Sequence, residues 1–168
     1  GKQAGFTGGT VILTEENDQA RISEMRKSGL NIMMSMKTSA KPVSFVEDCA
    51  VALPDLAEYT DKLTSIFTKY KTTGTWYAHA SVGCLHVRPV LDMKNSDDVA
   101  AMRKIAEEAF QLVKDYRGSH SGEHGDGISR SEFNEVMFGK KMAFLFKQVK
   151  KMLDPQSIFN PGKITDAP

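Results

Sequence analysis

The feature that most constrains the fold is an alternation of side-chain character over residues 76–88, which read Trp-Tyr-Ala-His-Ala-Ser-Val-Gly-Cys-Leu-His-Val-Arg. If Val82-Gly83 is a two-residue turn, this stretch is an antiparallel hairpin in which His79 lies opposite His86 and Tyr77 lies opposite Arg88. Because Val-Gly is not a preferred pair for such a turn, a longer or bulged loop is an alternative.

The alternation sorts the side chains of this hairpin onto two faces. The first face is apolar and carries Trp76, Ala78, Ala80, Leu85 and Val87; the second is polar and carries Tyr77, His79, Ser81, Cys84, His86 and Arg88. A slip of one residue would bury the histidines and expose the tryptophan. The pattern therefore predicts a sheet with one face in the core and one face available for chemistry.

The surrounding segments predict an α+β framework for this hairpin. Strands are expected at 43–53 (interrupted by Glu47-Asp48), 76–81 and 84–90, with a short strand near 118–122. Helices are expected at 54–71 and over a second stretch that starts after Asn95 or Ser96 and runs to about residue 116. This order predicts a ferredoxin-like antiparallel sheet with helices packed on one face. Further helices are expected at 15–27, capped by Thr14, and at the carboxy-terminal end, after Ser131 and over 140–153.

Length and charge exclude several classes of protein. The 168 residues suit a single domain, and a net charge of +1 gives no basic excess for nucleic acid. No apolar run is long enough for a transmembrane segment. The two cysteines, Cys49 and Cys84, are far apart in the sequence and fit free thiols in a reducing compartment.

Two opposed histidines are a candidate metal site. Residues directly opposite in an antiparallel pair have Cβ atoms about 4.5–5.5 Å apart, so the imidazoles of His79 and His86 could share one ion. The alternative is two solvent-facing histidines on a sheet without a ligand.

The glycine-rich stretch 118–127 is a second candidate element. Its glycines allow close backbone approach around Glu123-His124. Glu123 could complete a site of two histidines and one carboxylate, and His124 could act as a general base. His120 is a rival ligand that spacing does not exclude, and an ordinary polar loop is the alternative.

Taken together, the hairpin, the Glu123-His124 loop and the segment 154–164 resemble the carboxy-terminal domain of FAD-linked oxidases, from the vanillyl-alcohol-oxidase-like superfamily. That family includes D-lactate dehydrogenases, glycolate oxidase subunits and D-2-hydroxyglutarate dehydrogenases. The resemblance runs from about residue 26 to residue 164. The hairpin is most similar to that of the large bacterial form with an added iron–sulfur part, although Cys84 stands where many relatives have asparagine.

The resemblance implies roles for particular residues. His79, His86 and Glu123 fall on the positions that bind a divalent metal (zinc, manganese or iron), and His124 falls on that of the base that takes the hydroxyl proton. A substrate carboxylate is expected to meet Arg88, which shares the polar face of the hairpin; further cations are Arg26 (from the resemblance), Lys41 (from its charge alone) and Arg130. All of these except Arg88 are equally compatible with ordinary surface cations. Asn160 and Lys163 are similar to residues that approach the flavin.

The implied function is that of the substrate- and metal-binding (cap) domain of an FAD-dependent D-2-hydroxy-acid dehydrogenase. Its substrate would resemble 2-hydroxyglutarate or lactate, with hydride passing to the flavin and the proton to His124. The chain contains neither a GxGxxG fingerprint nor a P-loop, so residues 1–168 are expected to form a single domain without the FAD-binding domain, which would be its partner. Alone, the chain is expected to bind no FAD tightly and to be inactive.

The resemblance also implies an iron–sulfur cluster elsewhere in the full protein and a cytoplasmic location, with a peripheral position at the inner membrane as a variant. Two other readings compete with it. One is a non-enzymatic ferredoxin-like module that binds a ligand or a protein, in which the three proposed metal ligands are unrelated. The other is a metal-dependent hydrolase, which would need no flavin partner.

Overall fold

The structure, a computed structural model, describes residue 8 and residues 11–167, and it divides the chain into two units, residues 1–37 and 38–168. The amino-terminal unit contains one long helix, α1 (Glu16–Met34). This helix does not end at Ser28-Gly29 as predicted, because one interior glycine costs only about 1 kcal/mol. The predicted cap is also wrong: Glu15 occupies the cap position, and no side chain caps the helix.

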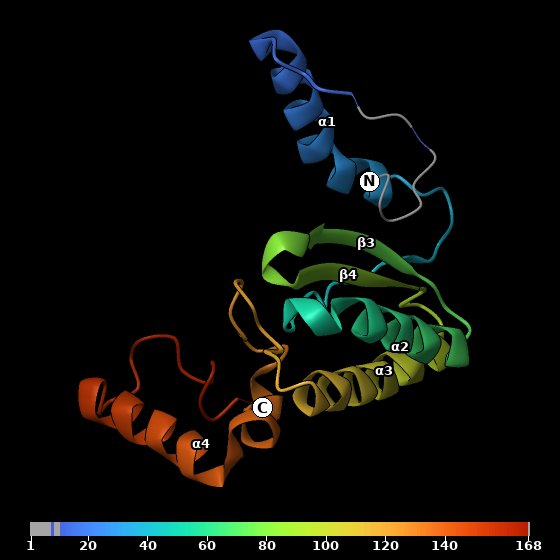
Figure 1. Cartoon of the computed structure of the whole chain (residues 1–168). Coiled ribbons are helices and arrows are strands. Elements are labelled where there is room, and N and C mark those ends of the chain that lie inside the picture. Colours follow the sequence, from blue (N-terminus) through green and yellow to red (C-terminus); the bar gives the residue numbers. More distant parts are fainter. Residues whose placement is uncertain (1–7, 9–10, 168) are drawn as a thin grey trace. The chain divides into compact units, whose positions relative to one another are not determined.

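The second unit is built on an antiparallel sheet whose central strand is β4 (Cys84–Leu91). β3 (Gly74–His79) pairs along one edge of β4, while β1 (Lys41–Pro42) and β2 (Asp48–Ala50) pair along the other (Figure 1). A single antiparallel bridge joins Ala50 to Ser119. The resulting order is Ser119, β2, β4, β3, and the predicted ferredoxin-like α+β architecture is confirmed, with its last strand reduced to one bridge.

The strand predicted over 43–53 is present only as the two short strands β1 and β2. Val43 still donates its N–H to Pro89 and Glu47 still accepts from Val87, so the chain follows β4 through the gap. The break therefore lies ahead of Asp48, which belongs to β2.

The hairpin register differs from the predicted one by two residues. His79 pairs with Cys84, Tyr77 with His86 and Thr75 with Arg88. The turn is a short 3-10 helix, η3 (Ala80–Val82), followed by Gly83 in the left-handed region at φ 72°, so the longer loop is the correct alternative. Because the shift is even, the side chains that lie in the two strands keep their predicted faces, while Ala80 and Ser81 belong to the turn.

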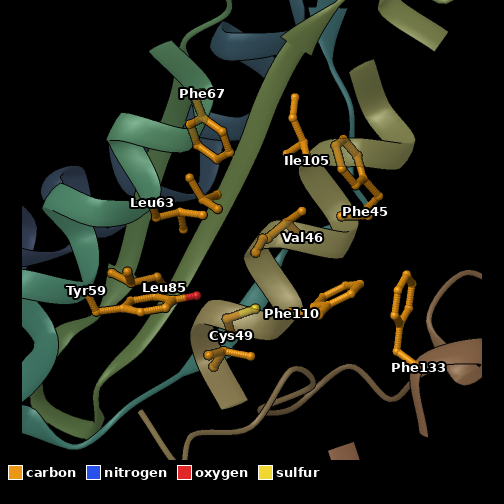
Figure 2. Close-up of a cluster of buried hydrophobic side chains, with 14 of the residues drawn as sticks. Phe45, Val46, Cys49, Tyr59, Leu63, Phe67, Leu85, Ile105, Phe110 and Phe133 are labelled. Atoms are coloured by element: carbon orange, nitrogen blue, oxygen red, sulfur yellow. The ribbon is translucent and has the colours of Figure 1, made fainter. Parts of the chain in front are cut away.

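Two helices cover the apolar face of the sheet (Figure 1). α2 (Leu56–Lys69) follows a turn of 3-10 helix, η2 (Leu53–Asp55), and α3 (Ser96–Asp115) begins after Asn95, whose side chain accepts the N–H groups of Asp97 and Asp98. Figure 2 shows the core between these layers. The sheet and the segment beside it contribute Phe45, Val46, Cys49 and Leu85, α2 contributes Tyr59, Leu63 and Phe67, α3 contributes Ile105 and Phe110, and the 3-10 turn ahead of α4 contributes Phe133. Tyr59 and Phe110 are both almost completely buried.

The carboxy-terminal region consists of η4 (Ser131–Phe133), α4 (Asn134–Leu153) and a tail. Gly139, at φ 81° and ψ 160°, is not helical, so α4 is in fact two helical segments, close to the pair predicted from sequence. Among the described residues, no helix combines the length and apolar character that a membrane span requires.

Candidate metal and substrate site

The two hairpin histidines meet on the polar face of the sheet. His79 ends β3 and His86 lies in β4, and their rings contact edge to face with centroids 4.9 Å apart. They are diagonal rather than direct neighbours, but the even register shift keeps them together. Tyr77 lies beside both, 5.7 Å from His79 and 5.6 Å from His86 between centroids.

Glu123, from the glycine-rich loop, completes a group of three potential metal ligands. Its Oε1 lies 2.7 Å from Nε2 of His86 and 3.4 Å from Nε2 of His79. All three donor atoms fall within 4.8 Å of one another. Ligands about 2.0–2.2 Å from a common ion lie about 3–4 Å apart, a range that the 3.4 Å pair meets, while the 2.7 Å pair lies at hydrogen-bond distance. The donor set of two imidazoles and one carboxylate fits one divalent ion with positions left open.

His124 stands next to these ligands, with its ring stacked on that of His86 at 5.2 Å. Its Nε2 is 3.7 Å from Oε1 of Glu123, and its Nδ1 is 3.2 Å from Oε2 of Glu47. The side chains of Glu47, His86 and His124 thus form a second group with metal-ligand spacing. The sequence pattern did not identify Glu47 as a site residue.

Glu47 links His124 to Arg88. Arg88 forms an ion pair with Oε1 of Glu47, and Ser44 donates to Oε2 at 2.8 Å. Burial raises the pKa of Glu47, but the hydrogen bonds from Arg88 and Ser44 outweigh it, and the pKa lies below its ordinary value. Glu47 is therefore an anion beside the imidazole, and Arg88 lies on the site face as predicted, already held by this carboxylate.

The loop that carries Glu123 and His124 runs along β2. Gly122 donates its N–H to the carbonyl of Asp48 at 2.8 Å, and a Cβ on Gly122 would lie 2.8 Å from that oxygen, so glycine is required for this approach. The Asp48 side chain accepts the N–H groups of Glu123 and His124 through Oδ2, at 2.8 and 2.7 Å. Sequence reasoning missed this role; the available signal was an acidic residue inside an otherwise apolar strand.

Arg130 and His120 lie away from the positions expected for them. Arg130 is buried and forms an ion pair with Asp48, so it is not a surface cation that could meet substrate. His120 is 1% exposed and packs against Phe110 and Phe138, and burial lowers its pKa. Neither group of potential metal ligands among the described residues includes His120.

The remaining predicted residues are distributed over other parts of the chain. Lys41 pairs with Leu91 at the far end of β4, and the register puts it on the face of Leu91 rather than on that of His86. Arg26 lies on α1, in the amino-terminal unit. Asn160 and Lys163 line a mostly apolar groove of about 840 Å³ between α4 and the tail. The structure thus brings together His79, His86, Glu123, His124 and Arg88.

Comparison with known proteins places the chain in a family. Residues 2–164 match the family described as FAD linked oxidases, C-terminal domain, and the chain belongs to this family, as its motifs predicted. It is 34% identical over 162 residues to D-2-hydroxyglutarate dehydrogenase of Escherichia coli, covering 96% of this chain and 16% of that protein. It is also 34% identical over 144 residues to the Haemophilus influenzae protein of the same name, covering 86% of this chain and 14% of that protein.

A more distant relative is the glycolate oxidase subunit GlcD of Bacillus subtilis, 28% identical over 149 residues, or 89% of this chain and 31% of that protein. The chain thus spans less than a third of the length of these curated relatives.

Proposed function

We propose that this chain is the substrate- and metal-binding part of an FAD-dependent dehydrogenase of D-2-hydroxy acids. The observation that carries the proposal is the convergence of His79, His86 and Glu123, with their donor atoms within 4.8 Å, next to His124. Family membership supports the flavin chemistry. Because the E. coli and H. influenzae relatives are named for D-2-hydroxyglutarate, that acid is the proposed substrate.

The three ligands would hold a zinc, manganese or iron ion. When bound, such an ion would supply Lewis acidity toward a substrate hydroxyl. Two imidazoles and one carboxylate leave coordination positions open for the hydroxyl and carboxylate oxygens of a 2-hydroxy acid.

His124 is the proposed base. Its Nδ1 faces the anionic carboxylate of Glu47, which favours the tautomer with the proton on Nδ1 and leaves Nε2 free to accept. That Nε2 lies 3.7 Å from Oε1 of Glu123, beside the open metal positions. His124 is therefore placed to take the hydroxyl proton as hydride leaves C2.

Arg88 is the proposed contact for a substrate carboxylate. It lies on the same strand and face as His86, two residues further along, and a guanidinium can bind a carboxylate through two parallel hydrogen bonds. Glu47 holds Arg88 in place. The groove at Asn160 and Lys163 is proposed as the surface that approaches the flavin. FAD would supply the hydride acceptor and be held mainly by a separate domain.

The metal site can be tested by calorimetry of zinc or manganese binding to this chain. We expect one ion per chain, and a loss of affinity of about 10-fold or more in each of the variants His79→Ala, His86→Ala and Glu123→Gln. Glu58→Gln is the matched control, because Glu58 is an exposed carboxylate on α2 that pairs with Lys62. Equal affinity in Glu123→Gln and Glu58→Gln would contradict the assignment.

The substrate class can be tested on the same preparation without flavin. Metal-loaded chain should bind D-2-hydroxyglutarate, and metal-free chain or Glu123→Gln should not. Binding that is independent of the metal would favour a non-enzymatic ligand-binding module. Hydrolytic turnover by the metal-loaded chain alone would favour a hydrolase.

A further inference from the structure

We infer that Asp48 and Arg130 are positioning residues, a buried ion pair that holds the backbone of Glu123 and His124 above the two hairpin histidines. This inference rests on the metal site proposed above. It concerns how the loop is fixed, and neither residue is proposed to touch the metal or the substrate.

Asp48 is well placed to connect the loop to the sheet. It lies in β2 directly opposite His86 in β4, so the two side chains share one face of the sheet. Asp48 is 0% exposed, and its Oδ2 accepts two successive backbone N–H groups, those of Glu123 and His124. The proposed metal ligand and the proposed base are thus fixed, through their own amides, to the residue across from His86.

Arg130 closes the loop from its other side. One nitrogen, Nη1, donates both to Oδ1 of Asp48 and to the carbonyl of His120, the latter at 3.0 Å. The other, Nη2, donates to the carbonyl of Gly125. Residues 120–125 therefore wrap around one guanidinium, and Arg130 is itself only 5% exposed.

The arrangement is better explained by positioning than by stability. A buried ion pair often contributes little to net stability, because desolvation of both charges opposes their attraction. Here, apart from the ion pair itself, every side-chain hydrogen bond of Asp48 and Arg130 given by the structure goes to the backbone of one loop. Metal ligands need support of this kind, and its loss typically lowers metal affinity about 10–100-fold.

A second carboxylate in the chain provides a matched control. Asp154, at the end of α4, is 6% exposed and accepts the N–H groups of Ile158 and Phe159 while pairing with Lys150. It therefore has the same chemistry as Asp48, two backbone amides and one cation, but it fixes the carboxy-terminal tail. A substitution at Asp154 removes a comparable anchor without touching the loop of Glu123.

The test compares Asp48→Asn with Asp154→Asn in the 168-residue chain. In Asp48→Asn the side-chain NH₂ replaces one of the two acceptor oxygens. It then faces either Arg130 or a backbone N–H, which are both donors, so at least one hydrogen bond is lost. We expect zinc affinity to fall about 10–100-fold in Asp48→Asn and to stay unchanged in Asp154→Asn. Cobalt substitution gives a second readout, since its visible spectrum reports ligand geometry and should change only in Asp48→Asn. If Asp48→Asn does not fold, Arg130→Lys serves instead, because lysine keeps the positive charge but lacks the two guanidinium nitrogens that donate to Asp48, His120 and Gly125.

Hydrogen exchange makes the test independent of the metal. Exchange at the amides of Glu123 and His124 should accelerate in Asp48→Asn and not in Asp154→Asn. Unchanged exchange and affinity would overturn the inference, and so would an equal loss of affinity in both variants, which would indicate a general loss of stability. Failure of the unsubstituted chain to bind metal would instead refute the proposed site, while the exchange comparison would still decide the role of Asp48.

Discussion

Two carboxylates, Glu47 and Asp48, each bind several hydrogen-bond donors and thereby position the residues around the site. The carboxylate of Glu47 pairs with Arg88, accepts a hydrogen bond from Ser44 and contacts the ring of His124. The carboxylate of Asp48 pairs with Arg130 and accepts hydrogen bonds from two backbone amides of the loop. For Asp48, burial raises the pKa, but the amide of His124 and the guanidinium of Arg130 outweigh it, and the pKa lies below its ordinary value. Both carboxylates are thus anions at neutral pH. They orient the neighbouring imidazole and the loop, and leave Glu123 as the carboxylate that faces the histidines.

Cys49 is the opposite case, a titratable group kept neutral in the core. Burial raises the pKa of its thiol to about 12. Since the thiolate is the reactive form, we expect native protein to show no alkylation of Cys49 at mildly alkaline pH, and denatured protein to react quickly. Peptide mass spectrometry after timed labelling measures this. Rapid labelling of Cys49 in the native state would show that the sheet around it opens.

At the scale of elements, the hairpin turn depends on one glycine. Gly83 has φ 72°, and a Cβ there would lie 1.9 Å from the carbonyl oxygen of Val51, whereas Gly127 has φ 54° with nothing within 4 Å. Alanine at either position would adopt a left-handed backbone conformation, which costs about 1–2 kcal/mol of folding free energy. Gly83→Ala adds a steric collision and should destabilise by about 1–3 kcal/mol more than Gly127→Ala. Urea unfolding of the two variants measures the difference, and equal losses would refute this account of the turn.

The carboxy-terminal tail should be released by acid. Lys150 and the amides of Ile158 and Phe159 hold the pKa of Asp154 below its ordinary value. The folded-state pKa is therefore lower than the unfolded one, about 3.9. The contribution of this contact is complete above that pH and is lost as pH falls through the folded-state pKa.

Exchange protection at the amides of Ile158 and Phe159, followed by NMR as pH falls, measures this loss. In Asp154→Asn protection should be low at every pH. Constant protection in the unsubstituted protein would contradict the prediction.

On the scale of the whole molecule, the sequence predicted the faces of the sheet better than its contacts. Alternation over 76–88 is a local property, so it predicted correctly which side chains join His86. The register was predicted wrongly, because turn length depends on the contact between Gly83 and Val51, which are far apart in the sequence. The pairing of Asp48 with Arg130 spans 82 positions and leaves no periodic signal. For the same reason, spacing alone could not separate the buried His120 from Glu123.

The whole chain is also expected to depend on a partner for its flavin. In the function proposed above, FAD is held mainly by a separate domain, and this chain matches the family described as FAD linked oxidases, C-terminal domain. We therefore expect purified chain, incubated with FAD and desalted, to retain no flavin absorbance. Stoichiometric flavin after desalting would show that the chain holds the cofactor by itself.

Anomalous scattering from crystals of the chain grown with zinc can locate the divalent ion proposed to bind His79, His86 and Glu123. We expect one anomalous peak, about 2.0–2.2 Å from Nε2 of both histidines and from a carboxylate oxygen of Glu123. A peak held instead by Glu47, His86 and His124, the other group with suitable spacing, would contradict this proposal, because His124 would then be a ligand and not the base. Absence of any peak at the hairpin would contradict it as well.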